Sequence, residues 1–350
     1  MKKLFVLISA VLFVSVVCFS RGMDIYAKQR RHLPRRGAKY EYCQLELASA
    51  QRQSGFQKEN MERAYTSYLL NQNESSLMAY KEAQLSYENS SFYVKYGKEW
   101  LNEKWQLEEA EFQCQVVSYP LRKSEYQYRK REVRFLKKRY EEASHRQKKG
   151  KLTRTEAEEI RCKLLSAREQ FRQKKQELHQ LKKEIQKRIK KQKIPDCSAP
   201  KIHRAAWYLS RWKRTKTEHR QISHQIAAFQ KYKDGLDAGS SGQNRHMVYA
   251  DTEIRRLTLQ ESQVLVQMNQ TIRQKRTAFL NAKRMQKGKD REISLARKKY
   301  QLVRLLWKKG KIVKSQVLEQ RADMARLESE KAALQYDMDV AAIQLEYGME

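Results

Sequence analysis

Apolar residues recur at helical spacing in two long stretches of the chain, and the two stretches follow one pattern. In both, the spacing alternates between three and four residues: Val133, Leu136, Tyr140 and Ala143 in the first, and Ile293, Ala296, Tyr300, Val303 and Trp307 in the second. This spacing places the apolar side chains on one face of a helix, so each stretch is predicted to be an amphipathic helix.

The two stretches are copies of one another at an offset of 160 residues. Arg131-Glu132-Val133 recurs as Arg291-Glu292-Ile293, Tyr140 recurs as Tyr300, and Lys148-Lys149-Gly150-Lys151 recurs as Lys308-Lys309-Gly310-Lys311. After the glycine, Leu152, Arg154 and Thr155 correspond to Ile312, Lys314 and Ser315. The matches run without a gap, which indicates an internal duplication.

The apolar pattern resumes after each glycine. The seam of the first copy contains Ile160, Leu164, Ala167, Phe171, Leu178, Leu181 and Ile185, and that of the second contains Met324, Leu327, Leu334, Met338, Ala341 and Leu345. A period of 3.5 residues is typical of left-handed coiled coils. The predicted fold is therefore mainly α, with long antiparallel helical hairpins in coiled-coil packing and a twofold internal repeat.

The residues around the two glycines suit hairpin turns. Gly150 and Gly310 are placed just past a helix end, where a left-handed residue costs glycine nothing sterically. Candidate N-caps for the returning helices are Thr153 or Thr155 in the first copy and Ser315 in the second.

Breaks in the pattern divide the chain. Residues 193–200 contain two prolines, residues 234–244 contain three glycines, and residues 89–97 are expected to be the equivalent break in the first half. Residues 40–88 and 201–233 are predicted to form further helices, and the helices before each turn to have 27 to 50 residues. The expected organisation is a signal peptide (1–22), a first repeat half (23–194), a linker (195–200) and a second repeat half (201–350).

Strand signals are weak. Residues 91–96, 112–119 and 247–259 contain β-favouring residues over short windows only, and the stretch before Pro120 fits a helix kinked at the proline equally well. A few strands therefore stay open as an alternative to helix in these windows.

The N-terminus indicates export. Lys2 and Lys3 precede an apolar run from Leu4 to Phe19, which suits a secretory signal and is short for a membrane-spanning helix. Small residues follow, so cleavage is expected between Ser20 and Gly22. An uncleaved anchor and a lipoprotein modified at Cys18 are the two alternatives.

The chain carries a formal net charge of +34. In a cytoplasmic protein this charge would indicate a nucleic-acid binder, but export removes nucleic acid as an expected partner. The acidic partners left are lipid headgroups, anionic envelope polymers or an acidic protein. The plainer interpretation is that the charge covers the solvated faces of long helices.

Candidate chemistry is sparse. Cys43, Cys114, Cys162 and Cys197 are widely spaced without a CxxC pattern, and no histidine stands at metal-ligand spacing. No nucleophile elbow, phosphate-binding loop or HExxH motif occurs, and adjacent acidic pairs point to different sides of a helix. We expect no enzymatic activity, no cofactor, no metal site and no required disulfide.

The second copy resembles the C-terminal half of TolC-like outer-membrane efflux proteins. The residues that carry the resemblance are Ala296, Tyr300, Gly310, Ile312, Ser315, Val317, Leu318, Ala322, Leu327, Tyr336, Ala341, Leu345 and Gly348. The first copy, with Tyr140, Gly150, Leu152, Thr153, Leu165 and Ala167, is similar to the N-terminal half of that family. Roughly residues 120–190 and 260–350 are covered.

The resemblance implies a homotrimer in the outer membrane and periplasm of a Gram-negative bacterium, touching outer-membrane lipid, in which each chain contributes a few β-strands to a shared oligomeric barrel. Its hairpin tips would meet the periplasmic adaptor of an inner-membrane pump, and Gly150, Leu152, Thr153, Gly310, Ile312 and Ser315 would be the adaptor-facing residues. The implied function is a passive conduit for efflux or type I secretion. The alternatives are a periplasmic or membrane-anchored coiled-coil scaffold with the same fold, and a binder of nucleic acid or another anionic polymer.

Overall fold

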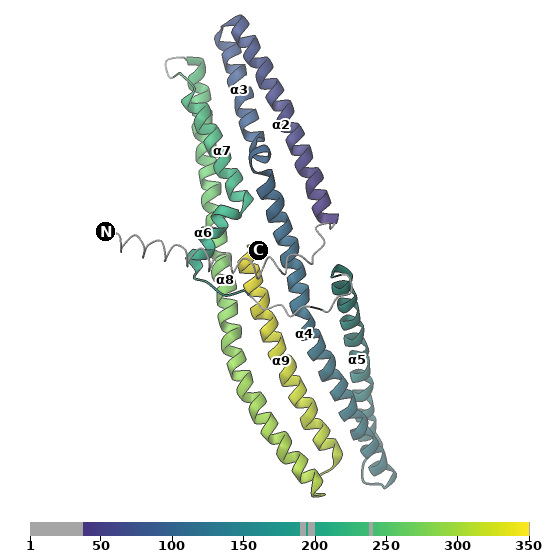
Figure 1. Ribbon diagram of the computed structural model, residues 1–350. Helices are drawn as coiled ribbons and strands as arrows, with labels where there is room; N and C mark the ends of the chain where they lie inside the picture. The colour runs from purple at the N-terminus through teal and green to yellow at the C-terminus, as the bar shows by residue number, and fades with distance from the viewer. Residues whose placement is uncertain (1–37, 190–193, 195–199, 238–240, 350) are drawn as a thin grey trace, which may run out of the picture.

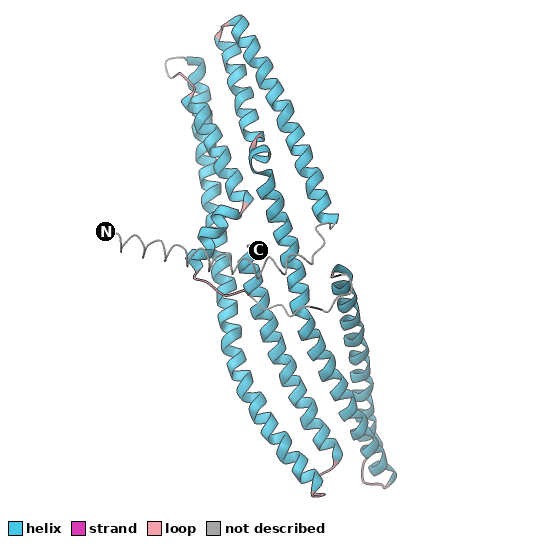
Figure 2. Cartoon of the chain, viewed as in Figure 1, coloured by secondary structure: helices cyan, strands magenta, loops and turns pink. Residues whose placement is uncertain are grey.

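The computed structural model describes residues 38–189, 194, 200–237 and 241–349. The predicted signal peptide with Cys18, residues 195–199 of the predicted linker, and Cys197 lie outside the described residues. The helices are α2 (Ala38–Asn71), α3 (Glu74–Ser90), α4 (Phe92–Lys148), α5 (Arg154–Arg188), α6 (Ala205–Thr215), α7 (Thr217–Asp234), α8 (Ser241–Lys308) and α9 (Lys314–Tyr347). The part of the chain that the structure describes is helical throughout, apart from turns and loops (Figure 2).

The molecule is elongated, and α8 runs along most of its length (Figure 1). One half contains the hairpins α4–α5 and α8–α9, which pack side by side in the order α5, α4, α9, α8. The predicted pair of antiparallel hairpins is therefore confirmed. Because this layer does not close on itself, α5 and α8 form its two edges.

The other half contains α2, α3, α6, α7 and the first parts of α4 and α8 (Figure 1). Its core gathers apolar side chains from several helices, with Tyr208 and Trp212 of α6 almost completely buried. The indole N–H of Trp212 donates a hydrogen bond of 3.0 Å to the carbonyl of Leu345. This contact ties the end of α9 to the half of the molecule that lies away from the hairpin turns.

The long helices exceed the expected 27 to 50 residues: α4 has 57 and α8 has 68. The break expected at residues 89–97 is the single residue Ser91, whose hydroxyl donates to the carbonyl of Glu88. In the break expected at 234–244, helix resumes at Ser241. Both breaks are therefore shorter than expected, and at the first one the hydroxyl of Ser91 supplies a local hydrogen bond in place of a loop.

The three windows with β-favouring residues are helical in the structure, and Pro120 lies inside α4. The apolar residues of the second window pack toward both neighbours of α4. Val116 contacts the cluster with Ile185 of α5, and Val117 contacts the cluster with Ile343 of α9. The apolar residues therefore reflect a helix buried on two sides.

Among the described helices, none contains an apolar stretch long enough to cross a membrane.

Candidate functional site: the paired hairpin tips

The turns of the two hairpins lie at the same end of the molecule (Figure 1). Gly150 and Gly310 adopt left-handed backbone angles, with φ of 69° and 71°. In the first turn the Gly150 N–H donates to the Gln147 carbonyl and the Lys151 N–H to the Arg146 carbonyl, and the second turn repeats this pattern. Both helices therefore end in a Schellman motif, which requires a residue that tolerates positive φ.

The first returning helix caps itself. The Thr153 hydroxyl accepts a hydrogen bond of 3.2 Å from the Glu156 N–H, and the Glu156 carboxylate accepts one of 2.9 Å from the Thr153 N–H. This reciprocal pair is a capping box, so the prediction of an N-cap at Thr153 is confirmed. The backbone hydrogen bond from Thr153 lowers the pKa of Glu156.

The second returning helix is capped by the first hairpin. The N-cap position is Val313, which has no oxygen in its side chain, and the prediction that Ser315 fills this position is wrong. The N–H and the hydroxyl of Ser315 both donate to the carboxylate of Glu142 on α4. A carboxylate near the first turn of α9 also interacts favourably with the helix dipole. Glu142 therefore joins the two tips.

A cleft of about 310 Å³ lies between the tips. It is lined from the first hairpin by Phe135, Arg139, Glu142 and Leu152, among others, and from the second by Val313, Ser315, Gln316 and Glu319. The lining combines apolar side chains with charges of both signs. This composition suits contact with a protein better than conversion of a small substrate.

The six residues predicted at the tips have different environments. Gly150, Thr153 and Gly310 are exposed, Leu152 and Ile312 are half-buried, and Ser315 is buried. Of these six, the structure brings Leu152 and Ser315 together at the cleft. Ser315 therefore faces the neighbouring hairpin.

The sequence did not predict that Glu142 caps a helix of another hairpin, and it did not predict a second carboxylate with the same role. The Glu103 carboxylate, also on α4, accepts hydrogen bonds from the N–H and hydroxyl of Thr217 at the start of α7. The N-cap of α7 is Lys216, whose side chain makes no capping hydrogen bond. The sequence could have indicated that α7 begins without a suitable cap residue. It could not have identified Glu103 as the acceptor, because Glu103 lies more than 100 residues away in the sequence.

Reactive groups are not gathered at the tips. No cluster of His, Cys, Asp and Glu in the described ranges could hold a metal ion. Cys43, Cys114 and Cys162 are free thiols, and burial raises the pKa of Cys114 to about 11.

Comparison with solved structures finds a similar arrangement of helices in several membrane proteins of bacteria. The crystal structure of CusC, described as folding and forming a transmembrane channel, matches 77% of this chain and 73% of its own, with 12% identity and a TM-score of 0.56. The outer membrane protein VceC from Vibrio cholerae matches 78% of this chain and 76% of its own, with 10% identity and a TM-score of 0.53. A membrane protein from Pseudomonas aeruginosa matches 90% of both chains, with 10% identity and a TM-score of 0.63.

No protein-family model matches the sequence, and no curated protein matches it either. At identities of 10% to 12%, the structural likeness establishes a shared fold. The resemblance to TolC-like proteins is confirmed at this level, as is the fold class of long helical hairpins in coiled-coil packing.

Proposed function

We propose that this chain is the outer-membrane channel component of an efflux or type I secretion system, a passive conduit formed by a homotrimer. The observation that supports it best is the open layer of four helices, whose fold is that of CusC and VceC. An open layer has two different edges, and joining one edge to the other edge of the next copy generates a ring when the rotation between copies closes.

Both edges carry exposed apolar residues on the side that faces away from the layer. On α8, Leu295, Leu302 and Leu305 are exposed by 69%, 58% and 55%, and on α5 Leu165 is exposed by 51%. The spacing of seven and three residues along α8 is that of a coiled-coil seam. Exposed leucines at this spacing support a helix of a second copy as the partner.

The charges on the two edges are unequal. Between Arg273 and Lys308, α8 has 13 basic and two acidic residues, whereas α5 has 11 basic and six acidic. The acidic residues of α5 include the exposed Glu158 and Glu169, which flank Leu165 at helical spacing. We propose that these carboxylates face basic residues of α8 around Leu302, where they reduce the repulsion between two edges of like net charge.

The paired tips would meet a periplasmic adaptor, as the TolC-like resemblance implied. We propose Gly150, Leu152, Thr153, Gly310 and Ile312 as the contact surface, with Ser315 as the residue that holds the second tip through Glu142. We also propose the division into repeat halves at 23–194 and 201–350, with residues 195–200 as the linker. The inner-membrane pump, the outer-membrane lipid and a Gram-negative envelope belong to the same proposal.

One observation favours the alternative of a periplasmic or membrane-anchored scaffold. The hairpins α2–α3 and α7–α8, at the end opposite the tips, are helical over the ranges described. A scaffold would need only the packed hairpins and no passage through a ring.

Envelope fractionation, followed by sizing of the detergent-extracted protein without boiling, separates the two functions. A detergent-dependent outer-membrane trimer supports the conduit. A soluble monomer, or a species in the inner membrane, contradicts the conduit and leaves the scaffold.

A double variant tests the interface. L295E/L302E places two carboxylates in the α8 seam and is expected to convert the trimer to a monomer. The matched control is L70E/L45E, because both leucines are exposed, by 80% and 71%, on α2. A trimer that persists in L295E/L302E contradicts the proposed interface.

A further inference from the structure

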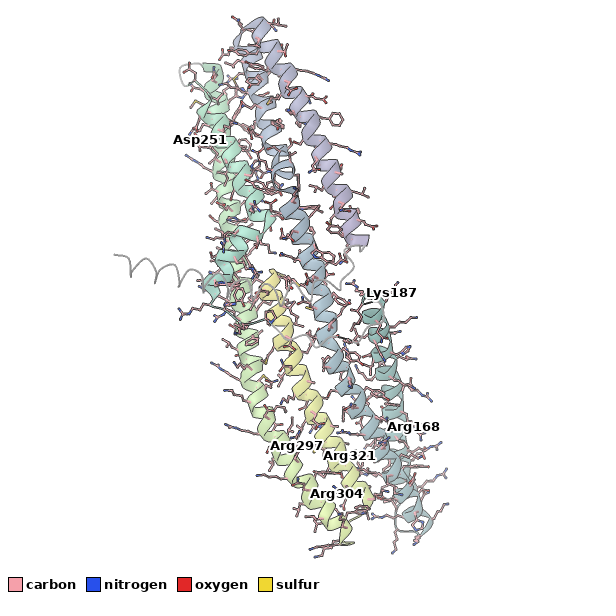
Figure 3. The ribbon with its side chains drawn as sticks, in the orientation of Figure 1. Arg168, Lys187, Asp251, Arg297, Arg304 and Arg321 are labelled. Carbon is pink, nitrogen blue, oxygen red and sulfur yellow. The ribbon has the colours of Figure 1, made fainter. Side chains whose placement is uncertain are left out.

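One face of the four-helix layer carries several exposed cations that form no ion pair in the described residues, whereas acidic residues of α4 and α9 on the opposite face pair with neighbouring cations. Glu328 of α9 fixes the first face, because it contacts Arg131 of α4 at 3.4 Å and Arg297 of α8 at 4.0 Å. Residues seven apart on a helix share a face, so Arg321 lies on it with Glu328, and Arg304 with Arg297. All three arginines, Arg297, Arg304 and Arg321, are exposed (Figure 3).

On α4 the same face continues as a column of lysines. Lys123, Lys130 and Lys137 are each seven residues apart and exposed, and Arg134, three residues after Arg131, is exposed beside them. Seven residues correspond to about 10.5 Å along a helix. None of these four cations forms an ion pair in the described part of the chain.

The column on α5 lies on this face as well. The Lys130 ammonium sits 5.9 Å from the Tyr126 ring, and Tyr126 stacks on Phe171 of α5 with ring centroids 5.3 Å apart. Arg168 and Lys175 lie three residues before and four after Phe171, so they share its side of α5. Both are exposed, and Figure 3 labels Arg168 on this helix. Together these four columns of cations are the cationic face.

The opposite face of the layer has a different balance. Glu125 and Glu132 follow Lys123 and Lys130 by two positions, which is about 200° around the helix. There Glu125 pairs with Lys174 at 3.2 Å and Glu132 with Arg129 at 2.7 Å.

The same holds on α9. Glu330, two positions after Glu328, pairs with Arg326 at 2.6 Å and with Lys289 at 2.9 Å. Along these parts of α4 and α9 the acidic residues therefore gather opposite the cationic face, and Glu141, four residues after Lys137, ends the lysine column.

We propose that the cationic face binds an extended polyanion, a chain of phosphate or carboxylate groups. Several charges at a spacing near the Debye length act together on a long anion, whereas a single small anion gains little from them. A lipid surface fits less well, because interfacial binding also needs apolar side chains in contact with the bilayer. In the described residues, the large exposed apolar side chains of the layer lie on α5, on α8 and in the turn before α9. The two central helices offer few of them to a bilayer, because α9 has none and α4 has only Val94, near its start.

The test measures binding of the purified full-length chain to long-chain inorganic polyphosphate and, in a second arm, to polygalacturonate. If six cations engage the polymer, the affinity is expected to fall roughly 300-fold between 50 and 200 mM salt. The phosphate and carboxylate arms distinguish the two sources of charge. Binding is measured whatever the oligomeric state, so a failure here leaves the conduit proposal standing.

The decisive variant is K123Q/K130Q/K137Q, with R52Q/K213Q/R255Q as the matched control. The control removes the same charge from exposed residues away from the layer, none of them in a described ion pair. We expect the first variant to bind at least tenfold more weakly at 100 mM salt, while the affinity of the control changes less than twofold. In a plot of the logarithm of the binding constant against the logarithm of the salt concentration, the slope of the first variant should be shallower by about 2. Circular dichroism verifies that both remain helical.

Two results would overturn the proposal. Equal losses in both variants would mean that net charge alone attracts the polymer. A lipid surface would be the partner if neither polymer bound, and if the unmodified chain and K123Q/K130Q/K137Q bound phosphatidylglycerol vesicles equally tightly.

Discussion

Removing the Glu142 carboxylate tests how the two tips are held together. In the structure this carboxylate accepts the N–H and the hydroxyl of Ser315, at the start of a helix whose own N-cap, Val313, offers no oxygen. We expect Glu142→Ala to release the first turn of α9 while the remainder of the helix stays packed against α4 and α8.

The magnitude follows from the two hydrogen bonds. Loss of an N-cap costs about 1 kcal/mol, and hydrogen bonds to a charged acceptor contribute about 1.5–3 kcal/mol when shielded from water. Glu142 is half-buried, so we expect about 1–2 kcal/mol for the local opening of α9. This corresponds to amide exchange about 5 to 30 times faster in the first turn of the helix.

Hydrogen exchange of peptides covering residues 312–320 is the appropriate assay, because it reports local opening in a chain too long for two-state unfolding. Ser315→Ala should produce a similar change, and the double variant E142A/S315A should add little to either single variant. E142Q, which keeps an acceptor oxygen, should have a smaller effect.

The matched control is Thr153→Ala, which removes the cap of α5 and should leave peptides 312–320 unchanged. The effects of E142A and T153A should add, since they act on different helices. Exchange in α9 that is the same in E142A and in the unmodified chain would refute a cap shared between the hairpins.

Three further predictions concern single residues. Gly310→Ala should destabilise the second turn by about 1 kcal/mol or more, because alanine disfavours the positive φ found there; hydrogen exchange of peptides covering residues 305–313 measures it, and Gly55→Ala, in the middle of α2, should be stabilising or neutral for its own helix. The capping box should stabilise α5 fully above pH 4.5, the ordinary pKa of glutamate, and this stabilisation should be lost as the pH falls through the lowered pKa of Glu156. In acid unfolding, E156Q should therefore lose less stability at low pH than the unmodified chain. A maleimide at neutral pH should label the exposed Cys162 quickly and Cys114 slowly, since burial raises the pKa of Cys114 to about 11; equal rates would contradict the packing of α4.

The helices and turns of the hairpin half were predictable because local signals agree there. Heptad spacing, a glycine at each helix end and Thr153 with Glu156 three residues later all specify the same hairpin. The cap at Ser315 was not predictable, since Glu142 reaches it only after two hairpins pack. The same is true of the sorted charges, because faces of a layer exist only once neighbouring helices are known.

Helix ends in the other half were less predictable for a different reason. Ser91 and Lys216 interrupt the helices at one residue each, without glycine or proline to mark them. Conversely, Pro120 lies inside α4, where packing against both neighbours outweighs the local penalty. Glycine and proline were therefore unreliable markers of helix ends here: two ends lack them, and one proline lies within a helix.

The uninterrupted length of α8 has a mechanical consequence. At 1.5 Å per residue, its 68 residues form a rod about 100 Å long that begins after the α7–α8 loop and ends at the second turn. A stiff rod turns a small tilt into a larger displacement, so a tilt of about 3° around its midpoint moves each end by roughly 2.5 Å. Forces applied to the helices around Trp212 would reach the tip as a swing of α8, whereas the path through α3 and α4 has a joint at Ser91.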